Sequence, residues 1–218
     1  MDLRAADELL TTTRSVRKRL DLARPVPRAL IEECIEIALQ APTGSNAQGW
    51  HFLAVTDPVK RAEIARYYKE ALSGYMKMQE AAGPRYTAPG DPRRDQETRV
   101  RESAIFLADH LHEVPVHVIP CIEGRVETAG VVAQASTYGS ILPAAWSFML
   151  AARARGLGTA WTTLHLVRER EVAKLVGIPD GVTQTALLPV AYFKGRDFQK
   201  AKRLPSRELT SWNTWGAR

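Results

Sequence analysis

The junction at residues 41–50 constrains the fold most, because a helical pattern ends there and an apolar strand follows directly. Apolar residues from Leu30 to Ala38 recur at spacings of three and four, which predicts one buried face of a helix. Pro27 suits the start of that helix, where a missing N–H has no helical partner to lose. The run at 51–55 predicts a strand. A helix, an exposed loop and a strand therefore follow one another.

The loop itself can hold a flat polar ligand. Its small residues, among them Gly44 and Ser45, leave backbone N–H and C=O groups accessible to a ring. Asn46 and Gln48 add side-chain amides, which both donate and accept hydrogen bonds. A polar connection without chemistry is the alternative interpretation, so other motifs must decide between the two.

Basic residues gather near both ends of the chain. The formal net charge is +6; residues 1–30 hold seven Arg or Lys against four Asp or Glu, and residues 194–207 hold six against one. This pattern predicts that the two ends converge on a compact polyanion such as a phosphorylated small molecule, with a merely solvated surface as the alternative. No nucleic acid is expected as a partner, because the basic residues form no long tract interleaved with aromatics.

Two motifs together identify a family. The segment 13–20 contains R-S-V-R, and the segment 41–50 reads A-P-T-G-S-N-A-Q-G-W. The stretch at 151–161 and the basic tail at 200–205 follow in the same order. With these motifs the chain resembles the FMN-dependent nitroreductase family over nearly its whole length. Helix–strand alternation alone would favour a doubly wound parallel sheet, but the chain has no G-x-G-x-x-G after a first strand.

The resemblance implies one α+β domain over residues 1–218, with a mixed, mainly antiparallel sheet wrapped by helices. It also implies an intertwined homodimer with two FMN sites at the subunit interface. The segment at about 200–218 is then an arm that embraces the partner subunit, which would cover Trp212 and Trp215.

The resemblance also assigns the residues that would bind FMN. The residues that would bind the phosphate come from both ends of the chain: Arg14, Ser15, Arg17, Lys200, Lys202 and Arg203. The residues that would bind the ring come from two internal segments. The first segment, supplied by the other subunit, contains Pro42, Thr43, Gly44 and Asn46, and the second contains Trp161, Thr162 and Thr163.

The chain departs from the family pattern at two places, and one assigned residue has an alternative interpretation. The family commonly has arginine where this chain has Thr13, and many members have Glu-Gly where it has Thr163 and Leu164. Trp161 is equally compatible with a place in the core. Lys18 and Arg19, beside the phosphate residues, are expected to be solvated.

The activity that the resemblance implies is reduction of nitroaromatics, quinones or a related electron-poor acceptor by NADH or NADPH, in a ping-pong hydride mechanism. The flavin supplies the chemistry, so no catalytic side chain is expected. A flavin-cleaving or enoyl/semialdehyde-reducing relative and a non-enzymatic flavin-storage protein are the alternatives. No metal site is expected, because His110 and His112 are two residues apart and point away from each other on a helix.

The remaining sequence predicts four helices and three strands. The helices are expected at 57–78, 100–111, 140–155 and 169–176. The helix at 140–155 is expected to be buried on all sides. The strands are expected at 114–119, 158–163 and 184–193. Gly, Pro and charged residues at 83–95 predict a mobile surface loop, either a lid or an insertion without function.

Two further expectations concern the whole chain. The absence of a long apolar run and of a signal-peptide pattern favours the cytoplasm and no membrane partner. Cys34 and Cys121 are expected to be buried thiols, because two cysteines are too few for a disulfide framework.

Overall fold

A computed structural model of the chain describes residues 1–86, 88, 91–196 and 198–217. Its central sheet is antiparallel at every strand pair. The strands are β1 (Trp50–Val55), β2 (Val116–Glu123), β3 (Leu157–Thr159), β4 (Val182–Gln184) and β5 (Leu188–Tyr192), in the order β1-β2-β5-β3, with β4 also paired to β2. A parallel bridge joins Ser15 to Thr159. The predicted α+β class with a mixed, mainly antiparallel sheet is confirmed.

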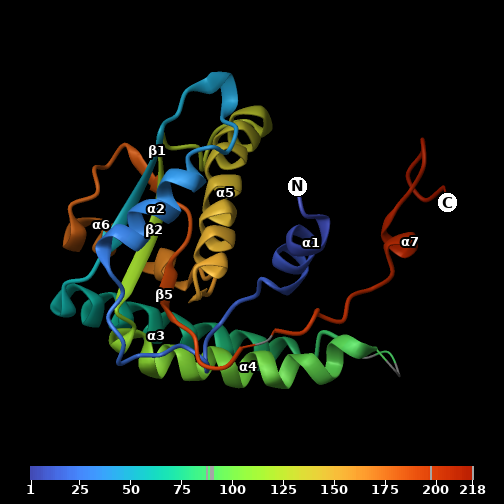
Figure 1. Cartoon of the computed structure of the whole chain (residues 1–218), viewed down its shortest axis with the longest axis horizontal. Helices are drawn as coiled ribbons and strands as arrows, with labels where there is room; N and C mark the ends of the chain where they lie inside the picture. The colour runs from blue at the N-terminus through green and yellow to red at the C-terminus, as the bar shows by residue number, and fades with distance from the viewer. Residues whose placement is uncertain (87, 89–90, 197, 218) are drawn as a thin grey trace.

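Helices surround this sheet (Figure 1). The α-helices are α1 (Leu3–Thr12), α2 (Arg28–Ala38), α3 (Pro58–Ala82), α4 (Pro92–His110), α5 (Val131–Ala154), α6 (Glu169–Val176) and α7 (Ser206–Leu209). Short 3-10 turns are η1 (Gly44–Asn46), η2 (Leu111–Glu113) and η3 (Leu164–Arg168). No described helix has the length and apolar character needed to cross a bilayer.

The core lies on both faces of the sheet. Successive side chains of a strand point to opposite faces, and β2 is buried on both. Val116 and Val118 join a cluster with residues of α2 and α5. Ile119 and Cys121 join a second cluster with residues of α3 and α4. The sheet is therefore a middle layer between α2 and α5 on one side and the α3–α4 pair on the other.

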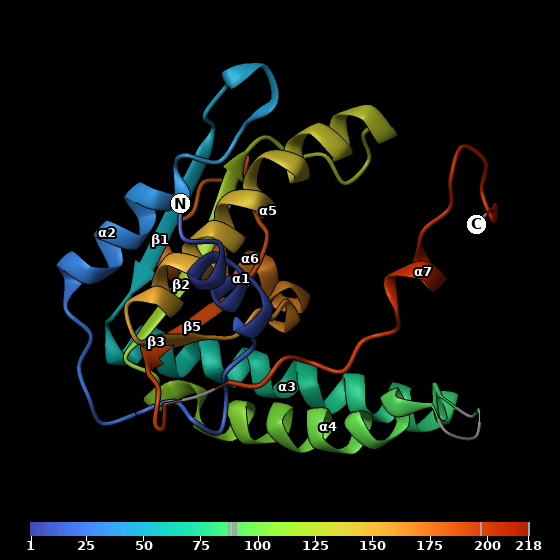
Figure 2. The ribbon, with the colours of Figure 1, turned by 45° about the vertical axis from the view of Figure 1, so that its right-hand side comes forward.

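The α3–α4 pair is inserted between two neighbouring strands. β1 ends just before α3, and β2 begins just after α4 and η2. Asp57 caps α3 by accepting from the Lys60 N–H at 2.8 Å, as its place before Pro58 predicts. Figures 1 and 2 show the two helices side by side across one end of the sheet, with the C-terminal segment running along them.

Three predicted boundaries were wrong. The loop predicted at 83–95 is shorter, because Pro92 starts α4 and Asp91 caps it; residues 87, 89 and 90 of this loop lie outside the described residues. The strand predicted at 158–163 ends at Thr159, and the one predicted at 184–193 is divided between β4 and β5. Helix α1 has no counterpart among the predicted elements.

The predicted core helix also differs from α5. It begins at Val131 rather than at residue 140, and Pro143 lies inside it. The prediction of burial on all sides of residues 140–155 was wrong for the single protomer, since Pro143 is exposed and Trp146 is 38% exposed. The sheet and α2 cover one face of α5, and α1 also contacts the helix. In the added first turn, Val131 and Val132 are each 83% exposed. Cys34 and Cys121 are buried, as predicted, and burial raises their thiol pKa values to about 11 and about 12.

Candidate functional site

The two basic ends of the chain lie side by side. The Arg14 guanidinium donates from Nη1 to the Gln199 carbonyl at 2.8 Å. The Lys194 N–H donates to the Arg19 carbonyl, also at 2.8 Å. The segment at 14–19 therefore lies beside Lys194 and Gln199, so the two basic segments are neighbours in the fold. Their predicted convergence on a polyanion stays a prediction.

The C-terminal cations continue from this contact. Lys200, Lys202 and Arg203 follow Gln199 directly and are exposed. Within the described residues, none of the three forms an ion pair or a side-chain hydrogen bond. Such unpaired cations beside Arg14 provide charge for an anion.

Lys18 and Arg19 lie beside these residues. Lys18 is exposed, as predicted, whereas Arg19 is only partly exposed, so the prediction of a solvated side chain was wrong for Arg19. Arg19 stacks on the Phe198 ring at 4.1 Å from its centroid and donates to the Lys194 carbonyl. Lys18 pairs with Glu102 of α4 at 3.2 Å. Both contacts hold the 14–19 segment in place, Arg19 against the C-terminal segment and Lys18 against α4.

Arg17 is half-buried and points toward α4. Its Nη1 donates to the Ser103 hydroxyl at 3.5 Å, and no carboxylate pairs with it among the described residues. Burial lowers the pKa of Arg17, and the neighbouring Tyr68 partly opposes that shift. A partly desolvated cation without a counter-ion gains from an anionic or strongly accepting ligand.

Tyr68 links Arg17 to the second predicted ring-binding segment. Its hydroxyl accepts from the Thr162 hydroxyl at 3.1 Å, although the side chain is only 2% exposed. Burial raises the pKa of Tyr68, so the hydroxyl stays protonated. The sequence places Tyr68 only within the helix expected at 57–78. The signal that could have found it is a tyrosine among aliphatic residues, whose hydroxyl needs a partner when buried.

The segment at 161–163 follows β3 at the edge of the core. Thr162 exchanges backbone hydrogen bonds with Leu187, at 3.2 Å from its N–H and 2.8 Å to its carbonyl. Thr163 is exposed, and Trp161 is half-buried against the cluster that contains α2 and α5. Thr162 thus lies next to Tyr68 and Arg17, while Trp161 contributes to packing.

The loop at 42–46 lies elsewhere in the protomer. Figures 1 and 2 show it near one end of α5, whereas residues 13–20 reach α4 near the other end. The Gly44 N–H donates to the Ser140 hydroxyl of α5 at 3.0 Å. Ser45, Asn46 and Gln48 have φ near +50°, which is unusual for residues other than glycine.

This loop is therefore held in one specific shape with Pro42, Gly44 and Asn46 exposed. One protomer presents the predicted site in two separate parts, the 42–46 loop and the group around Arg14, Arg17 and Thr162.

Gly158 allows the basic motif to reach the sheet. The Val16 N–H donates to the Thr159 carbonyl at 2.7 Å. A Cβ at position 158 would lie 3.0 Å from side-chain atoms of both Val16 and Leu20. The close approach of residues 15–20 to β3 thus depends on a residue without a side chain.

Gly158→Val is expected to lower the free energy of unfolding by roughly 1 to 2 kcal/mol, because the added methyl groups overpack this contact. Thermal or urea unfolding measures the change. Gly139→Ala is the matched control, because a Cβ there has no atom within 4 Å. Equal stability of Gly158→Val and the wild type would contradict the packing described.

Within the described ranges, no three His, Cys, Asp or Glu side chains are placed to share a metal ion. His110 instead pairs with Glu113 at 2.6 Å. His117 of β2 and His165 of η3 are fully buried, and the Coulombic influence of His117 lowers the pKa of His165 further. These two histidines lie in the interior, apart from the exposed cations.

Comparison with known proteins agrees with this arrangement. Residues 10–192 match the nitroreductase family. The chain is 26% identical to a nitrobenzene nitroreductase of Ectopseudomonas oleovorans, with 96% of each chain covered. Among solved structures it is similar to iodotyrosine deiodinase bound to FMN and 3-iodo-L-tyrosine, with 22% identity, a TM-score of 0.69, and 95% of this chain and 98% of the other covered.

A mutant of an FMN and NADPH-dependent nitroreductase from sphigopyxis sp. strain HMH is also similar, with 24% identity, a TM-score of 0.64, and 96% of this chain and 99% of the other covered. At such identities, likeness to solved structures shows a shared fold. The match to the family model shows family membership as well as the fold, because it covers the chain from the basic motif at 13–20 to the end of β5. The chain belongs to the nitroreductase family.

Proposed function

We propose that this chain is an FMN-dependent oxidoreductase that uses NADH or NADPH to reduce a nitroaromatic, a quinone or a related electron-poor acceptor. One observation carries the proposal: Arg14 contacts Gln199 at the start of the basic C-terminal segment, although the two residues come from opposite ends of the chain. Arg17, from the same motif as Arg14, lies beside Tyr68, whose hydroxyl accepts from Thr162. The names of the similar proteins, which include FMN, NADPH and nitrobenzene, support the same reading.

The residues present fit the phosphate of FMN. Arg14, Lys200, Lys202 and Arg203 are exposed cations, and the Ser15 hydroxyl adds a donor beside them. Guanidinium groups bind phosphate oxygens through two parallel hydrogen bonds, which a solvated lysine does not offer. These residues would hold the phosphate end, with Thr13 contributing no charge.

Arg17 and Thr162 fit the ring end. Arg17 is the more buried cation and lies beside Tyr68, whose hydroxyl holds the Thr162 side chain. Positive charge fixed in a partly buried place stabilises negative charge that develops during a reaction. Thr162 and Thr163 would present a hydroxyl and a backbone N–H to the ring, although this chain has Thr163 and Leu164 where many family members have Glu-Gly.

The complete site needs a second copy of the chain, and we infer that the protein works as a homodimer. In the protomer Val131 and Val132 are exposed on α5, and Trp212 and Trp215 are 70% and 98% exposed on the C-terminal arm. Apolar surface of this extent marks an interaction surface. A second copy would cover it and would bring its own 42–46 loop to the ring.

When bound, FMN would supply the hydride chemistry that connects NADH or NADPH to the acceptor. We expect the reductant and the acceptor to occupy the same site in turn, which would make the kinetics ping-pong. The chain holds the cofactor, orients the ring and supplies positive charge. No side chain is assigned as acid or base.

An anaerobic absorption spectrum tests this function. Protein loaded with FMN is expected to lose its yellow flavin absorbance when NADH or NADPH is added, and to regain it when a nitroaromatic follows. A chain that binds no FMN would contradict the proposal. A flavin that stays oxidised with both reductants would instead identify a storage protein.

A further inference from the structure

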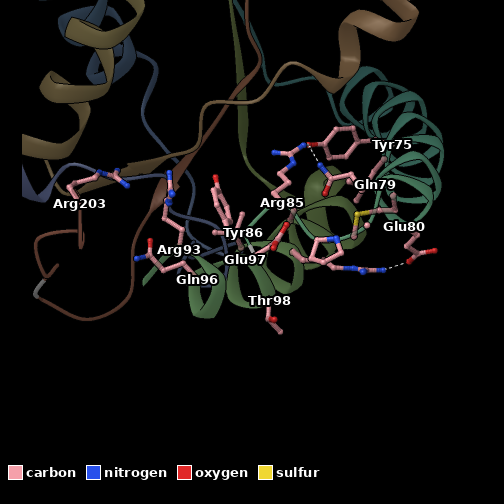
Figure 3. A pocket seen from close by; sticks show the side chains of 17 residues that line it. Tyr75, Gln79, Glu80, Arg85, Tyr86, Arg93, Gln96, Glu97, Thr98 and Arg203 are labelled. Carbon is pink, nitrogen blue, oxygen red and sulfur yellow. Dashed lines mark hydrogen bonds and ion pairs between the residues drawn. The ribbon is translucent and has the colours of Figure 1, made fainter. Parts of the chain in front are cut away.

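A hollow of about 850 Å³ opens between α3, α4 and the segment that joins them (Figure 3). Apolar side chains from the two helices form part of its wall: Leu72 and Met76 from α3, and Val100 and Ala104 from α4. Each pair is four residues apart, so each lies on one face of its helix. Two apolar faces opposite each other suit a flat ring.

The hollow begins where the proposed cofactor residues end. Arg203 lines it, and Ala104 follows Ser103, which accepts from Arg17. On α3, Leu72 lies one turn beyond Tyr68, a rise of about 6 Å along the helix axis. A ring held between the helices would therefore sit next to the group around Arg17 and Thr162.

The other end of the hollow is polar. The Tyr75 hydroxyl oxygen accepts from Arg85 Nη2 at 2.9 Å and from Gln79 Nε2 at 2.5 Å. With both acceptor positions used, its hydrogen remains to be donated to a ligand. In Figure 3 Tyr75, Gln79 and Arg85 lie together at one end of the labelled side chains, and Arg203 lies at the other.

Arg85 differs from the other wall arginines of the α3–α4 pair. Arg93 is bound by Asp91 through two oxygens, and Arg101 is paired with Glu80. Within the described residues Arg85 has no carboxylate partner, and its guanidinium keeps donors beyond the one used by Tyr75.

The wall as a whole favours a negative ligand. It holds four arginines, Arg85, Arg93, Arg101 and Arg203, against the two carboxylates of Glu80 and Glu97. Since Glu80 is already paired, the excess charge remains positive even with Glu97 ionised.

We propose that this hollow is the acceptor site and that it selects aromatic acceptors carrying a carboxylate. The ring lies between α3 and α4, and the carboxylate accepts from the Arg85 guanidinium and the Tyr75 hydroxyl. The inference rests on the proposed function and specifies its substrate class. For a nitro acceptor, NADH or NADPH supplies a hydride and solvent one proton; the nitro group becomes a nitroso group and one oxygen leaves as water.

The test uses two acceptors that differ only in charge, 4-nitrobenzoate and 4-nitrobenzamide. The readouts are the ratio of their kcat/KM values and the dissociation constant of 4-nitrobenzoate from the oxidised holoenzyme, measured by the change in flavin absorbance. Arg85→Gln is expected to lower the ratio about tenfold or more, because it removes a charge-assisted hydrogen bond. Arg85→Lys should restore part of it.

Arg94→Gln is the matched control, because Arg94 is an exposed arginine of α4 that does not line the hollow; this variant should leave the ratio unchanged. An unchanged ratio in Arg85→Gln would overturn the inference. The inference would also be overturned if Arg85→Gln lost a preference for NADPH over NADH in place of the change in ratio, because Arg85 would then bind the 2′-phosphate of the reductant. A wild-type holoenzyme that reduces the amide and the acid equally well removes only this inference, whereas a chain without FMN binding removes the proposed function as well.

Discussion

Arg17→Ala is expected to weaken FMN binding by about 10- to 100-fold, the range that follows from losing a hydrogen bond to a charged group. Arg17 is half-buried, its pKa is lowered by that burial, and it has no carboxylate partner among the described residues. Its charge is therefore available to a ligand rather than neutralised within the chain. Titration of the apoprotein with FMN, followed by flavin fluorescence, measures the change.

Lys18→Ala is the matched control for Arg17→Ala. Lys18 belongs to the same motif, but it is an exposed partner of Glu102, and pairs of that kind contribute little. Its loss should change FMN affinity less than about twofold. If Arg17→Ala binds FMN as tightly as Lys18→Ala does, Arg17 lies outside the cofactor site.

The second large effect is acid destabilisation through the buried histidines. Burial lowers the pKa of His117 from 6.5 to about 4 and that of His165 to about 3. Between pH 6.5 and 4 the unfolded chain therefore takes up protons that the folded chain does not, and the free energy of unfolding falls as the pH falls. The lowered pKa of His117 corresponds to about 3 kcal/mol of stability, all of it present above pH 6.5 and lost as the pH falls.

Urea midpoints at pH 7.5, 6 and 5 and constant ionic strength measure this loss. His165→Leu separates the histidines from other acid effects, because neither ring nitrogen of His165 has a hydrogen-bond partner among the described residues. The variant should be at least as stable as the wild type at pH 7.5 and should lose less stability at pH 5. A wild-type midpoint that is constant from pH 7.5 to 5 would show that the pair does not titrate on unfolding.

Much of the fold follows from local patterns. The structure agrees with three predictions that need only residues close together in the sequence. These are the helix with an apolar stripe before residue 39, the cap of α3 at Asp57, and the basic character of the segments near both ends of the chain. The start of α5 was missed because Gly139 is typical of a break in a helix. Contacts of the rest of the helix with α2 and the sheet compensate for the hydrogen bond that Pro143 cannot make.

The site was harder to predict for a related reason. Tyr68 reaches Thr162, and Ser103 reaches Arg17, only because α3 and α4 fold back across the sheet; no spacing within the sequence records these contacts. The same holds for Arg19, whose partner Phe198 is far away in the chain. Sequence reasoning found the residues with distinctive chemistry and missed the neighbours that orient them.

The insertion of α3 and α4 between two paired strands has a consequence for engineering. The chain leaves the sheet at the end of β1, forms α3 and α4, and returns at the start of β2. The register between β1 and β2 is fixed by the pairing of these two strands with each other. Under the proposed function, exchange of the one contiguous piece at 58–113 would replace both helices of the proposed acceptor site and leave Arg14 and Arg203 untouched. Tyr68 and Ser103 would have to be kept, because they contact Thr162 and Arg17. The proposed acceptor selectivity and the proposed phosphate binding would then be encoded in largely separate stretches of the polypeptide, so a library confined to this insert can be screened without rebuilding the rest.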